Sequence, residues 1–244
     1  MIFLEQFQPS NYQLPIEMNL NEFYDFLYDD AVRKIGADNC ETDQWLNSDT
    51  DDRRGITLMI RPDDKIDSGI ENFLCKLREI EPEQYFYPES DIHITVLSII
   101  SCHSGFSLSQ IEMGNYIETI RKSLYGFPPF EIEFKGLTAS PSCLMIRGFP
   151  KNNSLMQIRN NLRASFRNST LEQSIDKRYT IQSSHATVVR FRKPLHNKNS
   201  LFKAIEAYKN YSFGTFTVNA FELVFNDWYN RQAHRQNLYH FVLK

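Results

Sequence analysis

The sequence lacks the signals of secreted, membrane-spanning and zinc-binding proteins. Among 244 residues there are only four cysteines, without C-x-x-C spacing and without a Cys/His cluster at zinc-ligand spacing. The first residues have no basic region before a long apolar run, and no stretch reaches about 18 uncharged apolar residues. We therefore expect a cytoplasmic protein with reduced thiols that makes no contact with membranes. The cysteines are Cys40, Cys75, Cys102 and Cys143.

The net charge of −3 hides an uneven distribution of charge along the chain. Residues 1–52 carry 12 acidic and 2 basic side chains, whereas residues 53–244 carry 18 acidic and 25 basic ones. Phe23, Phe26 and Leu27 stand at helical spacing within the acidic part. This pattern predicts that residues 1–52 form an acidic, partly helical N-terminal extension on a basic main body, whose charge favours phosphate-bearing partners.

Apolar patterns predict alternating strands and helices after residue 53. The first half has a strand that bears His93, a helix, a Phe-x-[Ile/Val]-x-x-x-x-Leu segment and an apolar strand, and the second half repeats this order from His185. Duplicated units usually pack about a pseudo-twofold axis, which would bring the two histidine strands together. Strands are predicted at 55–60, 91–100, 130–134, 144–146, around 185, 216–225 and 238–243, and helices at 66–77, 117–124, 155–166 and 201–208.

Two short motifs give the main indication of function, His93-Ile94-Thr95-Val96 and His185-Ala186-Thr187-Val188. On a strand, side chains alternate between faces, so each motif would present an imidazole beside a hydroxyl. Either strand alone is explained by a core histidine next to a threonine of high β propensity. Their corresponding positions in the repeat favour one shared site.

The two H-x-T-x motifs resemble those that define the 2H phosphoesterases, a family that includes RNA 2′-5′ ligase-like proteins and 2′,3′-cyclic phosphodiesterases. The resemblance covers residues 53–244 and leaves residues 1–52 outside. It implies an α+β fold, bilobal and pseudo-twofold, with interleaved lobes, mainly antiparallel sheets flanked by helices and a central cleft. It also implies an enzyme with His93 and His185 as its catalytic pair.

The expected reaction opens a 2′,3′-cyclic phosphate or cleaves a 2′-5′ phosphodiester bond by acid–base catalysis. One histidine would take a proton from the attacking water and the other would give one to the leaving ribose oxygen. Thr95 and Thr187 would bind the non-bridging phosphate oxygens. The resemblance implies a product with its phosphate on the 2′ oxygen, and 2′-5′ RNA ligation as the reverse reaction. We expect no cofactor and no metal ion, an RNA end or a small nucleotide as partner, and a monomer.

Three further residues are candidates for substrate binding. Arg190 follows Thr187 by three residues, as in many bacterial members of the family, but strict strand alternation would turn it away from His185 unless the strand bulges. Tyr87 and Trp228 precede a motif and the final strand, and could stack on a base. Solvation of the arginine and ordinary packing of the two rings are the alternatives.

Two other functions remain open at this point. The fold could bind RNA or a nucleotide without turnover, although both motifs are intact. The histidines could instead be metal ligands of a hydrolase, but H-E-x-x-H and H-x-H are absent and Asp91 is the only carboxylate near either histidine.

Overall fold

The computed structural model describes residues 18–244 and combines five α-helices with nine strands in that range. The elements are α1 (Leu20–Gly36), β1 (Arg54–Ile60), α2 (Asp64–Ile80), β2 (Tyr85–Phe86), β3 (Ile94–His103), α3 (Met113–Leu124), β4 (Phe130–Ser140), β5 (Cys143–Pro150), α4 (Ser154–Arg167), β6 (Ala186–Arg190), α5 (Lys198–Ala207), β7 (Ser212–Val218), β8 (Ala220–Asn226) and β9 (Gln236–Val242). The α+β class predicted from the sequence is confirmed. Most predicted elements are present with longer bounds.

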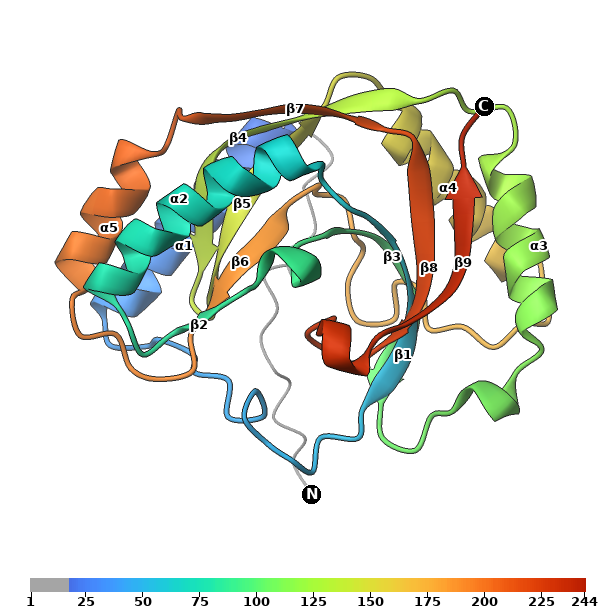
Figure 1. Ribbon diagram of the computed structural model, residues 1–244, viewed down its shortest axis with the longest axis horizontal. Helices are drawn as coiled ribbons and strands as arrows, with labels where there is room; N and C mark the ends of the chain where they lie inside the picture. The colour runs from blue at the N-terminus through green and yellow to red at the C-terminus, as the bar shows by residue number, and fades with distance from the viewer. Residues whose placement is uncertain (1–17) are drawn as a thin grey trace.

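The strands form one curved antiparallel sheet made of two half-sheets (Figure 1). Its order is β7-β4-β5-β6-β3-β1-β8-β9, and β2 pairs with β6. The half-sheet that begins with β6 and the half-sheet that begins with β3 are joined by a single residue pair, Ile94 with Ala186. Each motif therefore lies on the innermost strand of its half-sheet, at the centre of the molecule.

The strand predicted over residues 216–225 is in fact two strands, which is a correction. β7 ends at Val218 and pairs with β4, whereas β8 begins at Ala220 and pairs with β1 and β9. The chain thus passes from one half-sheet to the other at Asn219, as Figure 1 shows along the top of the molecule. Apolar residues continue across this junction because both strands have a buried face, so hydrophobicity alone does not mark the break.

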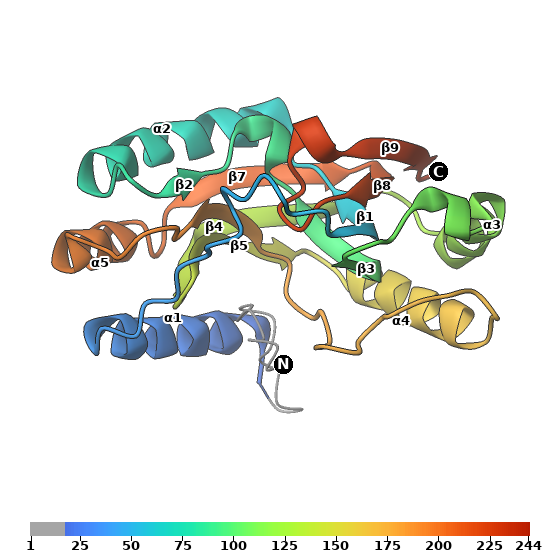
Figure 2. The ribbon, with the colours of Figure 1, turned by 90° about the horizontal axis from the view of Figure 1, so that it is seen from below.

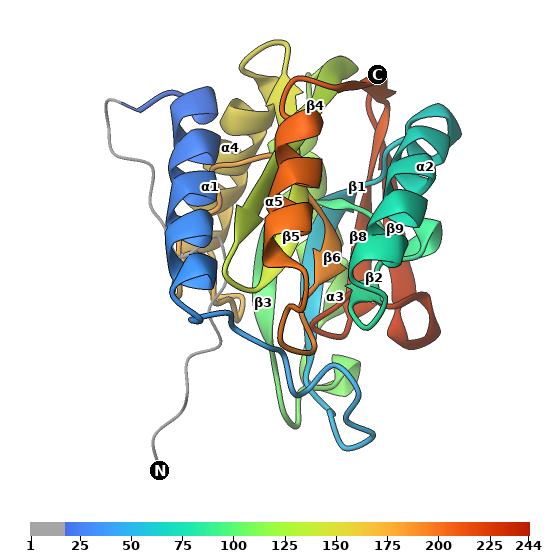
Figure 3. The same cartoon turned by 90° about the vertical axis from the view of Figure 1, so that its left-hand side faces the viewer.

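Helices cover both sides of the sheet. In Figure 2, α1 and α4 lie on one side of the central strands and α2 lies on the other, while Figure 3 shows α5 between α1 and α2. The apolar face predicted for α4 is buried, with Leu155, Ile158, Leu162 and Phe166 each at most 1% exposed. Between residues 18 and 244, no helix combines the length and the apolar character needed to cross a membrane.

Helix α1 belongs to the packed body of the protein. It begins with a capping box, in which the Asn19 side chain accepts from Glu22 N and the Glu22 side chain accepts from Asn19 N. Phe23 and Leu27 are buried against Cys143 and Met145 of β5, whereas Phe26 is exposed. The stripe of Phe23 and Leu27 anchors this helix to the half-sheet that carries His185.

Candidate active site

The two motifs face each other across the junction of the half-sheets. Ile94 and Ala186 form the connecting pair and are fully buried. In this antiparallel register position 93 lies opposite 187, and position 95 opposite 185. The side chains of His93, Thr95, His185 and Thr187 are all partly exposed, unlike their buried neighbours. Two imidazoles and two hydroxyls thus border the same junction.

A β-bulge follows the threonine of the first motif. In β3, Thr95 pairs with Met59 and Leu97 pairs with Leu58, so Val96 is an extra residue on this strand. The bulge reverses the alternation of side chains, which brings Ser98 to the face of Thr95. Accordingly, Thr95 and Ser98 line the same pocket.

A β-bulge also follows the threonine of the second motif. In β6, Thr187 pairs with Met145 and Val189 pairs with Leu144, so Val188 is the extra residue. In both motifs the bulged valine is the fourth residue, and in both it lies opposite a Leu-Met pair. The pseudo-twofold relation expected from the repeat therefore extends to the irregularities of the two strands.

Both imidazoles are held through Nδ1 by the residue two positions earlier. His93 Nδ1 lies 2.7 Å from the carbonyl oxygen of Asp91, and His185 Nδ1 lies 2.8 Å from Ser183 Oγ. The carbonyl oxygen of Asp91 can only accept a hydrogen bond, whereas the amide nitrogen of Asn230, 3.0 Å from the same Nδ1, can only donate one, so these two neighbours favour opposite tautomers of His93. Neither Nε2 has a hydrogen-bond partner among the described residues, and this nitrogen is left for a ligand.

The surroundings of both rings favour the neutral imidazole. Burial lowers the pKa of His93 to about 4, and the positive charges of Arg61 and Arg235 act in the same direction. Burial also lowers the pKa of His185 to about 4, together with the charges of Arg159, His93 and Arg190. A negatively charged ligand would counter these effects and favour protonation.

Several solved structures have a similar arrangement of strands and helices. TT0787 of Thermus thermophilus superposes with a TM-score of 0.58 at 14% identity, over 78% of this chain and 97% of that one. Escherichia coli LigT in complex with 3′-AMP gives 0.54 at 13% identity, over 79% and 99%, and a structure described as a phosphoesterase gives 0.54 at 13% identity, over 78% and 99%. The chain has the fold of the 2H phosphoesterases. Neither a protein-family model nor a curated protein sequence matches it.

Within this 2H fold, Arg190 lies on the face of Thr187, because the bulge at Val188 reverses the alternation after the motif. The bulge that Arg190 would need in order to reach the side of the motif is therefore present in this strand. Its side chain is buried, with Nε 3.4 Å from Tyr87 Oη and Nη1 3.8 Å from Asp43 Oδ2. Its positive charge lowers the pKa of the neighbouring His185.

Tyr87 and Trp228 differ in what they offer a ligand. Tyr87 is 2% exposed, so its ring has no open face for stacking, and its hydroxyl accepts from Arg190. Trp228 is partly exposed, and its ring centroid lies 5.1 Å from the Arg178 guanidinium carbon and 5.3 Å from that of Arg53. Trp228 lines the pocket beside the first motif.

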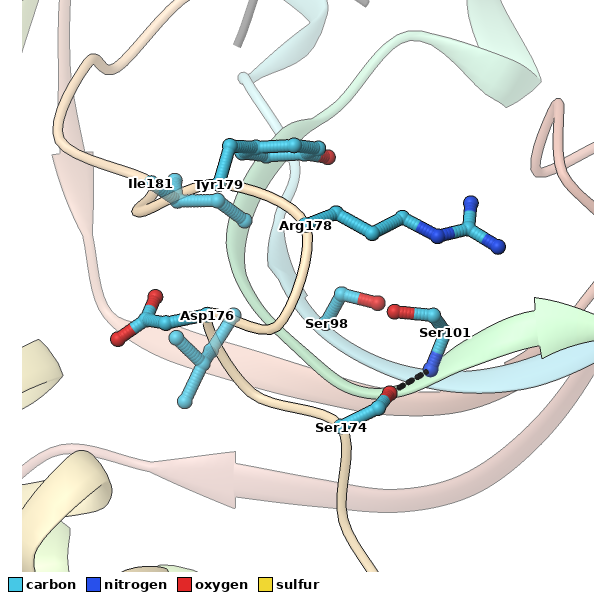
Figure 4. Close-up of a pocket in the computed structure, with 8 residues that line it drawn as sticks. Ser98, Ser101, Ser174, Asp176, Arg178, Tyr179 and Ile181 are labelled. Carbon is cyan, nitrogen blue, oxygen red and sulfur yellow. Dashed lines mark hydrogen bonds between the residues drawn. The ribbon is translucent and has the colours of Figure 1, made fainter. Parts of the chain in front are cut away.

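This pocket extends from the first motif across the half-sheet of β3, β1 and β8. Its walls come from these strands, from the loop after α4 and from the turn before β9. Figure 4 shows a neighbouring pocket, which shares Ser98, Ser101, Arg178 and Tyr179 with this one; there Ser174 Oγ accepts from Ser101 N at 2.7 Å. The pocket beside the first motif is lined by Thr57, His93, Thr95, Ser98, Ser101, Cys102, Arg178, Tyr179, Asn226, Trp228 and Asn230.

Several residues of the site carry no clear signal in the sequence. Asn226 and Asn230 are far from both motifs along the chain, and Arg178 precedes the second motif but lines the pocket beside the first, so all three reach the pocket only through the fold. Ser183 could have been noticed, because it precedes His185 by two residues as Asp91 precedes His93. Within residues 18–244, no three His, Cys, Asp or Glu side chains gather where they could hold a metal ion.

Proposed function

We propose that the chain is a phosphodiesterase that hydrolyses 2′,3′-cyclic phosphates or 2′-5′ bonds of RNA ends or small nucleotides. The observation that carries this proposal is the junction of β3 and β6, where both H-x-T-x motifs face each other across Ile94 and Ala186. Neighbours with the same fold support the nucleotide part, because LigT was crystallised with 3′-AMP, with ATP and with phosphate.

The proposed reaction displaces a ribose oxygen at phosphorus by water. One imidazole accepts a proton from the water at Nε2 as the new P–O bond forms, and the other donates a proton to the ribose oxygen as its bond to phosphorus breaks. Thr95 and Thr187 donate hydrogen bonds to the non-bridging oxygens, where negative charge is held. His93 and His185 can take either role in this scheme.

The pocket beside the first motif is the proposed site of the nucleoside. It has three buried atoms without a partner among the described residues, Asn226 Oδ1, Asn230 Oδ1 and Trp228 Nε1, which offer two acceptors and one donor. The edge of every nucleobase has both groups. Trp228 and the planar guanidinium of Arg178 provide surfaces against which a base can lie.

Replacing Trp228 with leucine is expected to raise KM for a 2′,3′-cyclic mononucleotide by about 10-fold with a smaller change in kcat. The reason is the loss of base stacking, which is worth about 1–3 kcal/mol per base. Trp228→Phe keeps a ring and should recover most of the affinity. Steady-state kinetics of both variants measure the effect.

Tyr125→Leu provides the control for this prediction. Tyr125 is an aromatic residue that is 89% exposed and lies at the end of α3, outside the pocket. Its variant should keep the KM of the unchanged protein. An unaltered KM for Trp228→Leu would place the base elsewhere.

The low pKa values of the histidines predict an acidic optimum for kcat/KM. Catalysis needs one protonated and one neutral imidazole, and the pKa of each is about 4 in the free protein. As the pH rises above this value the general acid loses its proton, so kcat/KM should fall between about pH 5 and pH 8. A pH profile with a cyclic uridine nucleotide, whose base does not titrate there, measures this.

The pH optimum of kcat should be higher than the pH optimum of kcat/KM. Bound phosphate places negative charge beside both rings and raises their pKa values. An optimum of kcat/KM at or above the ordinary histidine pKa of about 6.5 would contradict the prediction, because it would require unperturbed imidazoles.

The function itself is tested by incubating the purified protein with 2′,3′-cyclic mononucleotides and with 2′-5′ dinucleotides in excess EDTA. Turnover in the chelator supports the proposal, and the substrate that is consumed identifies the bond. Loss of turnover on chelation would point to a metal-dependent hydrolase. Saturable binding without turnover would point to a nucleotide-binding module.

A further inference from the structure

Arg159 of α4 binds at once to β3 and to the segment that leads into β6. Its side chain is buried, with the residue 3% exposed, and its guanidinium donates four hydrogen bonds, all to backbone carbonyl oxygens. Nε donates to Val96 at 2.9 Å and Nη2 to Thr95 at 2.9 Å. Nη1 donates to Gln182 at 3.1 Å and Nη2 also to Ser183 at 2.8 Å.

These contacts lie where the two half-sheets separate. β3 and β6 share only the pair of Ile94 and Ala186, so their facing edges do not continue as a hydrogen-bonded ladder. Carbonyl groups beyond this pair need other donors, since a buried carbonyl without a partner costs about 1–3 kcal/mol. The planar guanidinium, with five N–H donors in a fixed geometry, supplies them to both edges.

The carbonyl groups that Arg159 holds belong to residues of the site. Thr95 is the threonine of the first motif, and Ser183 is the residue whose hydroxyl lies 2.8 Å from His185 Nδ1. A shift of the guanidinium would therefore move Thr95, the proposed phosphate ligand of β3, and Ser183, whose hydroxyl supports the imidazole of His185. One side chain thus links the two halves of the site.

The charge of Arg159 is not neutralised by a direct ion pair. No carboxylate of residues 18–244 lies within ion-pair distance of its guanidinium, and burial lowers the pKa of Arg159 to about 9. After burial, this charge is the largest cause of the low pKa of His185, ahead of His93 and Arg190. Arg159 thus acts on the site through geometry and through charge.

We propose that Arg159 is a positioning residue of the active site, which fixes the spacing of the two motif strands so that His93 and His185 reach the same phosphate. This inference rests on the proposed function. It does not give Arg159 a contact with substrate, because the residue is only 3% exposed and four of its five N–H donors are occupied by backbone carbonyl groups.

Two variants separate geometry from charge. Arg159→Lys keeps the positive charge but has three donors on one nitrogen, which cannot span four carbonyl groups, so kcat should fall about 10-fold while KM changes little. Arg159→Gln also removes the charge, so kcat should fall about 100-fold and the pKa of His185 should rise toward its ordinary value. Kinetics give the first readout, and NMR titration of labelled histidine gives the second.

Arg163 supplies a matched control one turn further along α4. It binds Asp176 and the carbonyl oxygen of Ile181, and it touches neither motif strand. Arg163→Gln should therefore keep kcat close to that of the unchanged protein and leave the pKa of His185 low. Thermal unfolding of all variants reports any general loss of stability.

The inference is overturned if folded Arg159→Lys and Arg159→Gln keep kcat within about twofold of the unchanged protein. A purely structural arginine would lower the unfolding temperature and leave kcat and the His185 titration unchanged in the folded molecules. If Arg159→Gln does not fold, kcat of Arg159→Lys decides. If the unchanged protein has no turnover, the proposed function fails, and the NMR titration still tests whether Arg159 acts on His185.

Discussion

Replacing His93 or His185 with alanine is expected to lower kcat for a 2′,3′-cyclic mononucleotide by about 100-fold to 10,000-fold. Each imidazole performs one of the two proton transfers, and a positioned general acid or base contributes a factor of this size. Each ring offers only Nε2 to a ligand, because Nδ1 is engaged by Asp91 or by Ser183. The measurement is single-turnover and steady-state kinetics in excess EDTA.

His103→Ala is a matched control for this prediction. His103 lies on the same strand as the first motif, and its Nδ1 is 3.0 Å from the carbonyl oxygen of Ser101, as Nδ1 of His93 is engaged by Asp91. Its side chain is exposed and does not line the pocket, so kcat should not change. Full activity of either motif variant would contradict acid–base catalysis by the pair. Loss of activity in only one would show that a single histidine is required.

The convergence of the motifs could be predicted because two independent patterns agreed. Alternation placed His93 beside Thr95 and His185 beside Thr187, and the internal repeat related the two strands by an axis. The structure joins these strands at Ile94 and Ala186, the residues between each histidine and threonine. The alternation of side chains along each strand was therefore enough to predict which histidines and threonines meet at the junction.

The bulges could not be predicted from this period. Val96 and Val188 have ordinary strand side chains, and the partner strand decides that each is the extra residue. As a result, alternation alone left open whether Arg190 faces the site, and it gave no reason to place Ser98 on the face of Thr95. A bulge depends on how two strands pair, so it cannot be predicted from the sequence of one strand alone.

Arg159 was missed for a related reason. In the sequence it is one of several basic residues of a helix, at a position that helical spacing assigns near the apolar stripe of Ile158 and Leu162. Its importance comes from four carbonyl oxygens on segments that are distant along the chain. The acceptors are backbone carbonyl groups, which every residue has, so residue types do not indicate which of them Arg159 binds.

Helix α1 gives the second prediction with a large expected effect. A chain that begins at residue 37 lacks this helix and should not form a cooperatively folded protein. The buried apolar side chains of α1 are Phe23, Tyr24, Leu27, Tyr28, Ala31 and Ile35. Burial of a large apolar side chain contributes about 1.5–3 kcal/mol, so the set is comparable to the net stability of a domain, about 5–15 kcal/mol. Urea unfolding followed by circular dichroism measures the result.

The same helix also supports the second motif directly. The Tyr24 hydroxyl accepts from the backbone N–H of Ser184, the residue before His185, at 3.0 Å. It donates to the carbonyl oxygen of Gly148 at 3.2 Å. The backbone of Gly148 in β5 approaches that of Ser184 so closely that a Cβ at Gly148 would lie 2.0 Å from the carbonyl oxygen of Ser184. Tyr24→Phe removes only the hydroxyl, so it should fold and should lose part of kcat.

A chain that begins at residue 18 is the control for the truncation, because it keeps α1 and every contact described above. It should unfold cooperatively at nearly the urea concentration of the full chain and retain its kcat. If the chain that begins at residue 37 instead folds and keeps kcat, α1 would be a dispensable extension, and the contact between Tyr24 and Ser184 would not position His185. Reduced kcat in Tyr24→Phe at unchanged stability would show that the helix acts on the site as well as on the core.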